Sequence, residues 1–473
     1  MRSCGRGWTT WRRFHSQWKQ RSNLAGRFCS GERVHEPGRG HSRAMRRSDA
    51  VWLAAVCVCE MATMLVFLNY TAVLPILQAE WGMRHGEAGL IFSAYQACYL
   101  LAVLVLASLT DRMDTRMIYL ASATWGGVAS LAFPLFAQGF RSAAILRALA
   151  GIGLAGTYVP GMRLVAQRFA TERRGLAIAC YASAFGLGSA ASLFLSGHLA
   201  RVGGWRLAMG ITAVGPLLAA VLAAAVLSPA PPPPGRGTRL LDSRVFRNRP
   251  ALWMIAGYSA HNWELFGMRA WLPPFLAAAL VRRGASVVEA SSLAAALASG
   301  VLLAGAASNI VGGWASDRWG RLRVIVGSQV LSAACSLTIG WLFDAPLWVI
   351  LAVAAAYGIF VTSESGALST GVTELAEPSA LGATLAVQSC LGFLAAALSP
   401  VSVGILLDLL QAPAGGRAAF SPWQWGPAFG VLALGVLMGP ISMFALRRAL
   451  AEPVVRTTPD LPSSPVDHER PGR

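Results

Sequence analysis

The chain has few charged residues, and almost none of its basic residues are lysine. Only 13% of its 473 residues are charged, whereas about a quarter is usual in soluble proteins. Lys19 is the single lysine, so arginine supplies nearly all the positive charge behind the formal net charge of +18. Apolar residues make up 55% and fall in long runs without strict alternation. These features exclude an ordinary soluble domain and indicate a polytopic membrane protein.

Motifs of several other protein classes are missing as well. The sequence contains no G-x-x-x-x-G-K-[ST] phosphate-binding loop, which argues against the use of ATP. Its eight Cys show neither metal-ligand spacing nor a secreted disulfide framework. We therefore predict no metal site, no cofactor and no catalytic residue. The arginines lie mainly in short loops, where they fix membrane orientation, so we expect no nucleic-acid partner.

The first 48 residues also lack the apolar stretch of a secretory signal peptide. Two interpretations of this basic segment remain open. In one, residues 1–48 are a disordered cytoplasmic tail. In the other, which we favour, translation begins at Met45, and MRRSDAVWLAAV supplies a short basic leader before the first apolar run.

Long apolar runs are what the sequence has in abundance. Twelve of them are long enough to cross a bilayer, and each is predicted to be a helix because a chain in lipid must satisfy its backbone internally. The runs cover about residues 51–74, 87–109, 117–138, 142–163, 175–199, 206–228, 250–280, 288–315, 323–343, 346–369, 381–409 and 426–447. The predicted fold class is an all-α membrane protein.

A Pro-rich and basic segment divides these spans into two sets of six. SPAPPPPGRGTRLLDSRVFRNRP, residues 228–250, is typical of a stiff linker. We expect a six-helix bundle over 49–227, a linker over 228–249, a second six-helix bundle over 250–450 and a disordered tail over 451–473. Arginines gather in the even-numbered loops, the linker and the termini, so the positive-inside rule predicts that both termini are cytoplasmic.

The loops after the second and the eighth spans repeat one another. The first reads ASLTDRMDTRM over 107–117, and the other reads GWASDRWGRLR over 313–323. This match indicates an internal repeat of the two halves. Asp beside Arg at a helix end can form charge-assisted bonds that are made in one state and broken in another. The predicted gating residues are Asp111, Arg112, Arg116, Gly313, Asp317, Arg318, Gly320 and Arg321. The alternative is that these charges only fix the topology.

The second loop is similar to the signature G-x-x-x-D-R-x-G-R of the major facilitator superfamily. The first loop departs from that signature, with Ala107 and Asp114 in place of glycines. LRALAGIGLAGTYVPG, residues 146–161, also resembles the fourth-helix motif of that family. A weaker likeness points to its cyanate and nitrate/nitrite permease branch. The resemblance covers about residues 46–450 and implies two parallel six-helix bundles in pseudo-symmetric arrangement, with a binding site between them.

Several polar residues lie inside the apolar runs, where an isolated charge is costly. Glu60 and Glu264 lie at similar depths in the first and seventh spans, which suggests a cavity between the halves and a proton carried there. Asn69, Tyr158 and Glu364 are further candidates for this cavity. For the carboxylates, the alternative is a structural pair with an Arg or with backbone donors.

The fourth span carries Arg147 within the membrane. An arginine at this depth is usually functional, and the family resemblance implies a part in proton handling. The alternative is that its side chain extends to the membrane interface.

The seventh span, SAHNWELFGMRAWLPPF over 259–275, holds the densest set of polar groups. At about 100° per residue, one half of the helix carries the polar side chains His261, Asn262, Glu264 and Arg269. Trp263 and Phe266 are expected to point the other way. We predict that the polar half faces the cavity and contacts substrate and protons. Pro273 and Pro274 are expected to break the helix toward its outer end.

Together these features predict a secondary transporter of a small hydrophilic solute in a bacterial inner membrane. Proton coupling is expected because acids lie within the membrane and no sodium-site pattern is evident. Arg147, Arg269 and His261 favour a small anion as substrate. We expect a monomer whose partners are this solute, protons and the lipid bilayer. The alternatives left open are efflux of a drug or metabolite, a polytopic membrane enzyme and a receptor that transports nothing.

Overall fold

The computed structural model describes residues 47–110, 112–229, 242–411 and 421–451, which form helices and, within these ranges, no β-strand. The tails predicted at 1–48 and 451–473 and the centre of the predicted linker lie largely outside the described residues. The predicted gating residue Asp111 also lies outside them.

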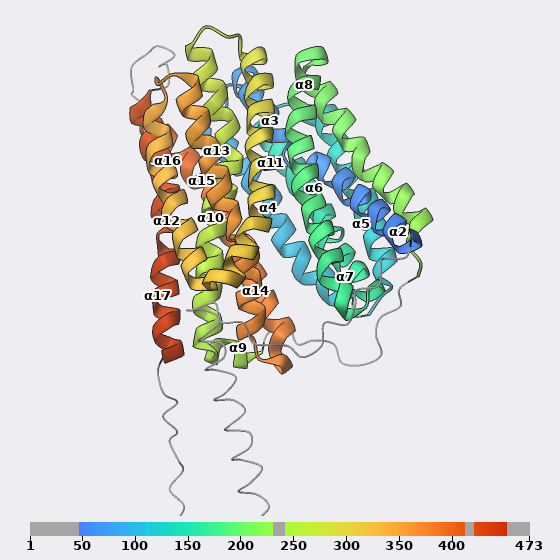
Figure 1. Cartoon of the computed structure of the whole chain (residues 1–473). Helices are drawn as coiled ribbons and strands as arrows, with labels where there is room; N and C mark the ends of the chain where they lie inside the picture. Colours follow the sequence, from blue (N-terminus) through green and yellow to red (C-terminus); the bar gives the residue numbers. More distant parts are fainter. Residues whose placement is uncertain (1–46, 111, 230–241, 412–420, 452–473) are drawn as a thin grey trace, which may run out of the picture.

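The first bundle is built from helices α2 to α8 (Figure 1). Its elements are α2 (Arg47–Thr63), the 3₁₀ turn η1 (Met64–Val66), α3 (Asn69–Trp81), α4 (His85–Leu109), α5 (Thr115–Phe136), α6 (Phe140–Ala155), α7 (Tyr158–Arg168) and α8 (Thr171–Val226). α8 consists of two spans, because the backbone leaves the helical conformation at Gly203 and Gly204. The φ of +78° at Gly204 favours glycine, and Figure 1 shows the two arms of α8 meeting there.

The second bundle lies beside the first (Figure 1). Its elements are α9 (Ser243–Arg247), α10 (Arg249–Arg282), α11 (Val287–Trp319), α12 (Arg321–Ile339), η2 (Gly340–Leu342), α13 (Leu347–Ser363), α14 (Ser365–Leu375), η3 (Pro378–Ala380), α15 (Leu381–Leu409), α16 (Pro422–Val436) and α17 (Met438–Ala451). Eleven segments of the described chain are long and apolar enough to span a membrane, and one of them, Arg173–Val226, contains two predicted spans. The predicted fold class is confirmed.

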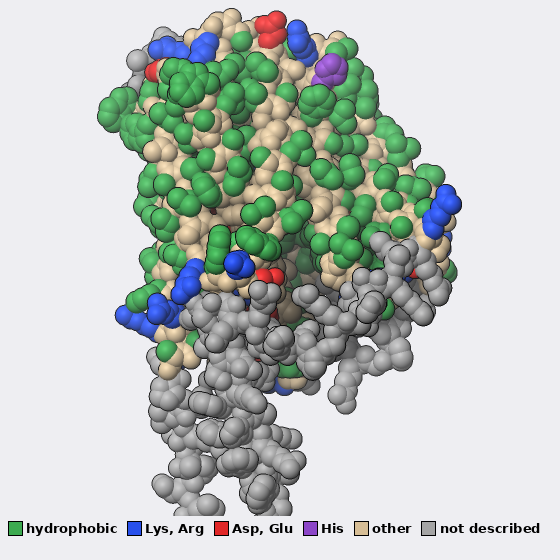
Figure 2. All heavy atoms as spheres, viewed as in Figure 1, with side chains coloured by type: hydrophobic (Ala, Val, Ile, Leu, Met, Phe, Trp, Pro, Cys, Tyr) green, Lys and Arg blue, Asp and Glu red, His purple; other side chains and the backbone are tan. Residues whose placement is uncertain are grey.

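The outer surface of the two bundles suits a lipid environment. Figure 2 shows a broad belt of hydrophobic side chains, with the charged side chains gathered toward the two ends of the molecule. Large apolar residues such as Leu101, Val128 and Phe194 are more than half exposed. Contact with lipid tails is the environment in which such exposure carries no cost.

The first span is interrupted near its middle, between α2 and α3. Ser192 Oγ accepts a hydrogen bond from the backbone N–H of Leu68, at 3.1 Å. Arg147 donates to the carbonyls of Val66 and Phe67, at 2.9 and 3.1 Å. A helix break inside a membrane is tolerated only where protein groups satisfy the freed backbone atoms, and these side chains from α8 and α6 do so.

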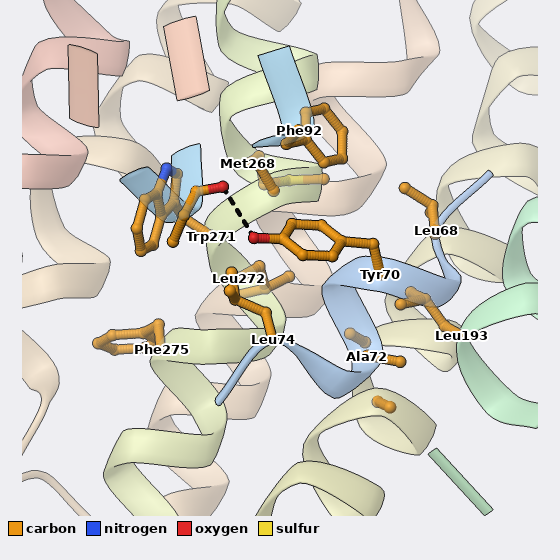
Figure 3. Packing of buried hydrophobic residues seen from close by; sticks show 14 of the residues in the cluster. Leu68, Tyr70, Ala72, Leu74, Phe92, Leu193, Met268, Trp271, Leu272 and Phe275 are labelled. Carbon is orange, nitrogen blue, oxygen red and sulfur yellow. Dashed lines mark hydrogen bonds between the residues drawn. The ribbon is translucent and has the colours of Figure 1, made fainter. Parts of the chain in front are cut away.

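The two ends of the molecule differ in how the bundles pack. At one end a single hydrophobic cluster joins both bundles, and Figure 3 shows Tyr70 and Leu74 of α3 beside Leu272 of α10. At the other end each bundle has a core of its own, one containing Val165 and the other Leu368. We call the end with α7, α9 and α14 the open end, because the bundles diverge there (Figure 1). The opposite end, where α4 begins, is the closed end.

Candidate substrate-binding cavity

A cavity of about 650 Å³ lies between the two bundles. Its volume is in the range of small-molecule sites. Figure 2 shows a hollow between the bundles toward the open end. The side chains on its wall include Phe67, Gln96, Tyr99, Tyr158, Phe185, Tyr258, His261, Asn262, Phe266, Arg269, Asn309, Thr362, Ser365 and Phe393. About half of these side chains are aromatic and half are polar, and small and aliphatic residues form most of the rest of the wall.

Helix α10 supplies a continuous stripe of this wall. Tyr258, His261, Leu265 and Arg269 are three or four residues apart, so they share one face of the helix and all border the cavity. Asn262 borders it as well. Phe266 was expected to point away, and that expectation is wrong. Its ring also lies on the wall, because the cavity extends past the side of the helix on which the polar groups lie.

α10 runs without interruption through Pro273 and Pro274, so the break expected there is absent. Both prolines are buried, and the helix is enclosed by neighbours along most of its length. Nearby, Trp271 Nε1 donates to the carbonyl of Pro400 at 2.8 Å. Proline removes a backbone hydrogen bond, but packing on every side holds the helix through the two positions.

His261 connects the cavity with a buried carboxylate. Its Nδ1 lies 2.9 Å from Oε1 of Glu364, and its Nε2 lies 2.9 Å from Oγ of Ser365. Glu364 is fully buried at the junction of α13 and α14. An imidazole and a carboxylate in contact can hold or release one proton, and here the imidazole is the member that borders the cavity.

Arg269 presents a cation to the cavity without a carboxylate partner. Within the described chain no Asp or Glu forms an ion pair with it. Its Nε is buried and has no hydrogen-bond partner among the same residues. The guanidinium carbon lies 5.5 Å from the ring centroid of Phe266 and 6.0 Å from that of Phe185. This planar cation between aromatic rings has the geometry to bind an anionic ligand through two parallel hydrogen bonds.

Glu60 lies inside the first bundle and does not border the cavity. Tyr181 donates to its Oε2 at 2.6 Å, and no described residue pairs with its Oε1. The ring of Tyr181 stacks on that of Tyr158, with centroids 6.1 Å apart, and Tyr158 does border the cavity. Two aromatic rings therefore separate Glu60 from the cavity.

Glu264 is buried within the second bundle. Its Oε2 accepts from Oγ of Ser332 on α12 at 2.7 Å, and its Oε1 has no partner in the described chain. It lies about 105° around α10 from the centre of the cavity-facing stripe. The structure thus brings His261, Asn262 and Arg269 together on the cavity wall and leaves Glu60 and Glu264 outside it.

Arg147 and Asn69 are also set back from the cavity. Nη1 of Arg147 donates to Oδ1 of Asn69 at 3.2 Å, in addition to its bonds to the break in the first span. Its guanidinium carbon lies 4.3 Å from the ring centroid of Tyr95, and Asn69 Nδ2 donates to Thr212 at 3.0 Å. Arg147 is buried and does not extend to the interface. It holds the segment that carries Phe67 onto the cavity wall.

The gating residues predicted in the second half make contacts inside their own bundle. Arg321 at the start of α12 forms two hydrogen bonds to Glu374 of α14, at 2.8 and 2.7 Å. Asp317 is exposed and lies 3.6 Å from Arg321. Gly320 joins α11 to α12 with a φ of +91°, which favours glycine. Gly313 borders the cavity.

The remaining gating residues lie around the loop between α4 and α5 or at the end of α11. Arg116 donates to the carbonyl of Ala224 on α8 at 2.8 Å, and Asp114 caps α5 by accepting from the backbone of Arg116. Arg112 and Arg318 are exposed. The contacts that Arg116 and Arg321 make connect helices of one bundle, at the open end of the molecule.

A polar contact that no sequence pattern predicted joins the bundles at the closed end. Asp408, near the end of α15, accepts from the backbone N–H groups of His85 and Gly86, each at 2.8 Å. Its Oδ1 also lies 2.9 Å from Nδ1 of His85. A carboxylate at the start of α4 is stabilised by the helix dipole. Asp408 lies 323 residues from His85 in the chain, so no local pattern relates the two.

Asn309 is a second functional candidate that the sequence interpretation missed. It borders the cavity from α11, and its Oδ1 accepts from the backbone N–H of Gly366 at the start of α14. A single Asn in an apolar run was its only signal.

Two bundles of membrane spans around a cavity that is open at one end define a solute transporter. Comparison with known families specifies which kind. The model of the Major Facilitator Superfamily matches residues 56–301 and 280–468. The chain belongs to that family.

Several transporters of known solutes are similar in sequence. The gallate transporter of Pseudomonas putida is 26% identical over 60% of this chain and 69% of its own length. The cis,cis-muconate transport protein of Acinetobacter baylyi is 23% identical over 72% of this chain and 83% of its own length. The 4-hydroxybenzoate transporter of the same organism is 22% identical over 67% of this chain and 76% of its own length. Together with the family match, these relatives confirm the prediction of a solute transporter and set aside the membrane-enzyme alternative.

Solved structures share the fold. A bacterial homologue of the human lysosomal transporter Spinster, in an inward-facing and unoccupied conformation, matches with a TM-score of 0.68 and 17% identity, over 86% of this chain and 98% of the other. The nucleoside transporter NupG matches with a TM-score of 0.65 and 13% identity, over 85% of this chain and all of the other (100%). At these identities the likeness concerns the fold alone.

Proposed function

We propose that the chain is a secondary transporter of small organic carboxylates that works as a monomer in a bacterial inner membrane. The observation that carries this proposal is Arg269, a cation on the cavity wall with no ion-pair partner in the described chain. Aromatic rings beside it offer contact for an apolar or planar body. The solutes named for the similar transporters, gallate, muconate and 4-hydroxybenzoate, are carboxylates of this kind and support the proposal.

The aromatic wall favours an organic anion over cyanate or nitrate. An ion of a few atoms would occupy only a small part of a cavity of about 650 Å³ and would leave most of its rings without contact. Small-molecule sites are mainly apolar, with a few polar groups that fix the orientation of the ligand. One guanidinium among aromatic side chains suits a ligand with one charged end.

Transport proceeds by alternating access in this proposal. The bundles share one core at the closed end and have separate cores at the open end. The arginine-rich loops after α4, α7 and α11 lie toward the open end (Figure 1). The positive-inside rule therefore favours the cytoplasmic side for that end and for both termini. The structure then corresponds to the form that exchanges solute with the cytoplasm, and rocking of the bundles exposes the same cavity to the other side.

The pair formed by His261 and Glu364 is our proposed proton site. His261 and Arg269 both face the cavity from α10, and eight residues of helix place them about 12 Å apart. A carboxylate bound to Arg269 raises the affinity of the pair for a proton. The bound proton raises the affinity of the site for the carboxylate by the same factor. The anion and the proton would therefore cross together. Glu60 and Glu264 remain proposed as secondary proton sites.

A thermal-stability screen of the purified protein tests the class of substrate. A ligand that binds the folded protein raises its melting temperature. We expect stabilisation by aromatic and aliphatic carboxylates, and none by neutral sugars or lipophilic cations at the same concentration. Stabilisation by lipophilic cations with no response to any carboxylate would instead support the drug-efflux alternative and contradict the proposal.

A further inference from the structure

Gln96 is a buried amide on the cavity wall that has no partner in the described chain. It belongs to α4, borders the cavity and is only 1% exposed. Neither its Nε2 nor its Oε1 forms a hydrogen bond with any described residue. A carboxamide offers two donors and an acceptor, and buried groups of this kind are normally satisfied in native proteins. A ligand group that reaches this amide from the cavity would satisfy atoms that are otherwise unpaired.

The wall around Gln96 is aromatic and uncharged. Tyr99 lies one turn further along α4, and its ring centroid is 4.5 Å from that of Phe393. The ring centroids of Phe393 and Phe266 are 5.9 Å apart. The described cavity-lining residues of the first bundle include no Lys, Arg, Asp or Glu. A second carboxylate on the ligand would find no cation on this side. A neutral hydroxyl, in contrast, would find both a donor and an acceptor in the amide.

We propose that Gln96 determines specificity by hydrogen-bonding a neutral hydroxyl on the body of the substrate, while Arg269 binds its carboxylate. The inference rests on the proposed function and narrows its substrate class to hydroxylated monocarboxylates. The hydroxyl accepts from Nε2 or donates to Oε1, which satisfies an atom that is otherwise unpaired. An acid without the hydroxyl leaves the buried amide unsatisfied and binds less tightly.

The test compares benzoate with its 2-, 3- and 4-hydroxy derivatives as ligands of the full-length protein. We expect the wild type to bind at least one hydroxybenzoate about tenfold more tightly than benzoate, since one such hydrogen bond has that effect. Gln96→Met replaces the amide with an apolar chain of similar length. In this variant we expect the preference to fall to about twofold or less, with benzoate affinity kept or improved. Gln388→Met is the matched control, because Gln388 is buried on α15 outside the cavity wall.

The outcomes separate this inference from the function on which it rests. An unchanged preference in Gln96→Met, or an equal loss of affinity for all four acids, overturns the role of Gln96. If Gln96→Met does not fold, Gln96→Asn withdraws the amide by one methylene and must lower the preference while keeping benzoate binding. Wild type that binds benzoate and its hydroxy derivatives equally overturns the inference alone. Wild type that binds no carboxylate at all overturns the proposed function as well.

Discussion

At the scale of single residues, Arg269 is the group on which substrate binding depends most. Arg269→Gln removes the charge and the two-pronged hydrogen bond to a carboxylate, and we expect it to weaken binding about a hundredfold. Arg269→Lys keeps the charge but not the planar guanidinium, so we expect it to weaken carboxylate binding only about tenfold. Isothermal titration of the purified protein with the best carboxylate measures both.

The control for these variants is Arg206→Gln. Arg206 lies largely exposed beside Glu80, away from the cavity wall. We expect the Arg206→Gln protein to bind the carboxylate with the affinity of the wild type. Equal affinities of Arg269→Gln and wild type would show that the anion binds elsewhere.

A second prediction at this scale concerns Glu364, the buried partner of His261. Glu364→Gln removes the carboxylate that stabilises a protonated imidazole. We expect carboxylate uptake to become independent of an imposed pH gradient, while exchange of labelled for unlabelled substrate persists. Glu264→Gln is the comparison, because Glu264 is equally buried but faces Ser332 of α12. Loss of gradient dependence in Glu264→Gln alone would assign coupling to Glu264 instead.

The side chains of α10 show how far sequence alone could predict the site. Helical periodicity correctly relates His261 and Arg269 to one another, and both border the cavity. Periodicity gives only relative angles, and the position of the cavity around the helix depends on which neighbours pack there. For that reason the helical periodicity assigns Glu264 to the cavity side although it faces α12, and directs Phe266 away from the cavity although its ring lies on the wall.

At the scale of elements, the broken first span depends on Arg147. Arg147→Met keeps the volume but leaves the carbonyls of Val66 and Phe67 without their donor in a buried site. We expect a loss of stability of about 3 kcal/mol, seen as a lower midpoint of thermal denaturation in detergent. The exposed Arg141→Met serves as control. A midpoint equal to that of the control would mean that the break needs no such donor.

The same span shows which elements the sequence could predict. The twelve spans could be predicted from the apolar runs, because a helix that crosses a bilayer must be long and apolar. Both properties belong to one continuous stretch of the chain. The interruption between α2 and α3 escaped prediction. The groups that satisfy it, Ser192 and Arg147, lie 124 and 81 residues away in the chain. No local pattern carries that information.

At the scale of the whole molecule, Asp408 links the bundles at the closed end. Asp408→Asn removes its charge and the second oxygen that accepts from the start of α4. We expect the two bundles to separate there in a larger fraction of molecules. Electron–electron distance measurements between spin labels at Phe136 and Trp348, both exposed, in a cysteine-free background should then show longer distances.

Asp344→Asn is the control for that experiment. Asp344 is half exposed and lies 3.5 Å from Arg282 of its own bundle. We expect the distances between the two spin labels in Asp344→Asn to match those in the wild type. Equal distributions in all three proteins would mean that hydrophobic packing alone keeps the closed end shut.

The repeat of the two loops predicted a pair of related bundles, and the fold has them. The sequence could not tell which end is open. That property depends on how two cores pack against one another across the whole interface, including the joint core around Tyr70 and Leu272. It differs between conformations that one sequence can adopt.

The most direct test of the central claim is uptake of a labelled aromatic carboxylate into proteoliposomes, by wild type and by Arg269→Gln. The gradient is set acidic outside and alkaline inside. We predict that the wild type accumulates the acid above its external concentration, that a proton ionophore abolishes this accumulation, and that Arg269→Gln shows none. Accumulation by Arg269→Gln at the wild-type rate, or wild-type accumulation that is insensitive to the ionophore, would contradict the account.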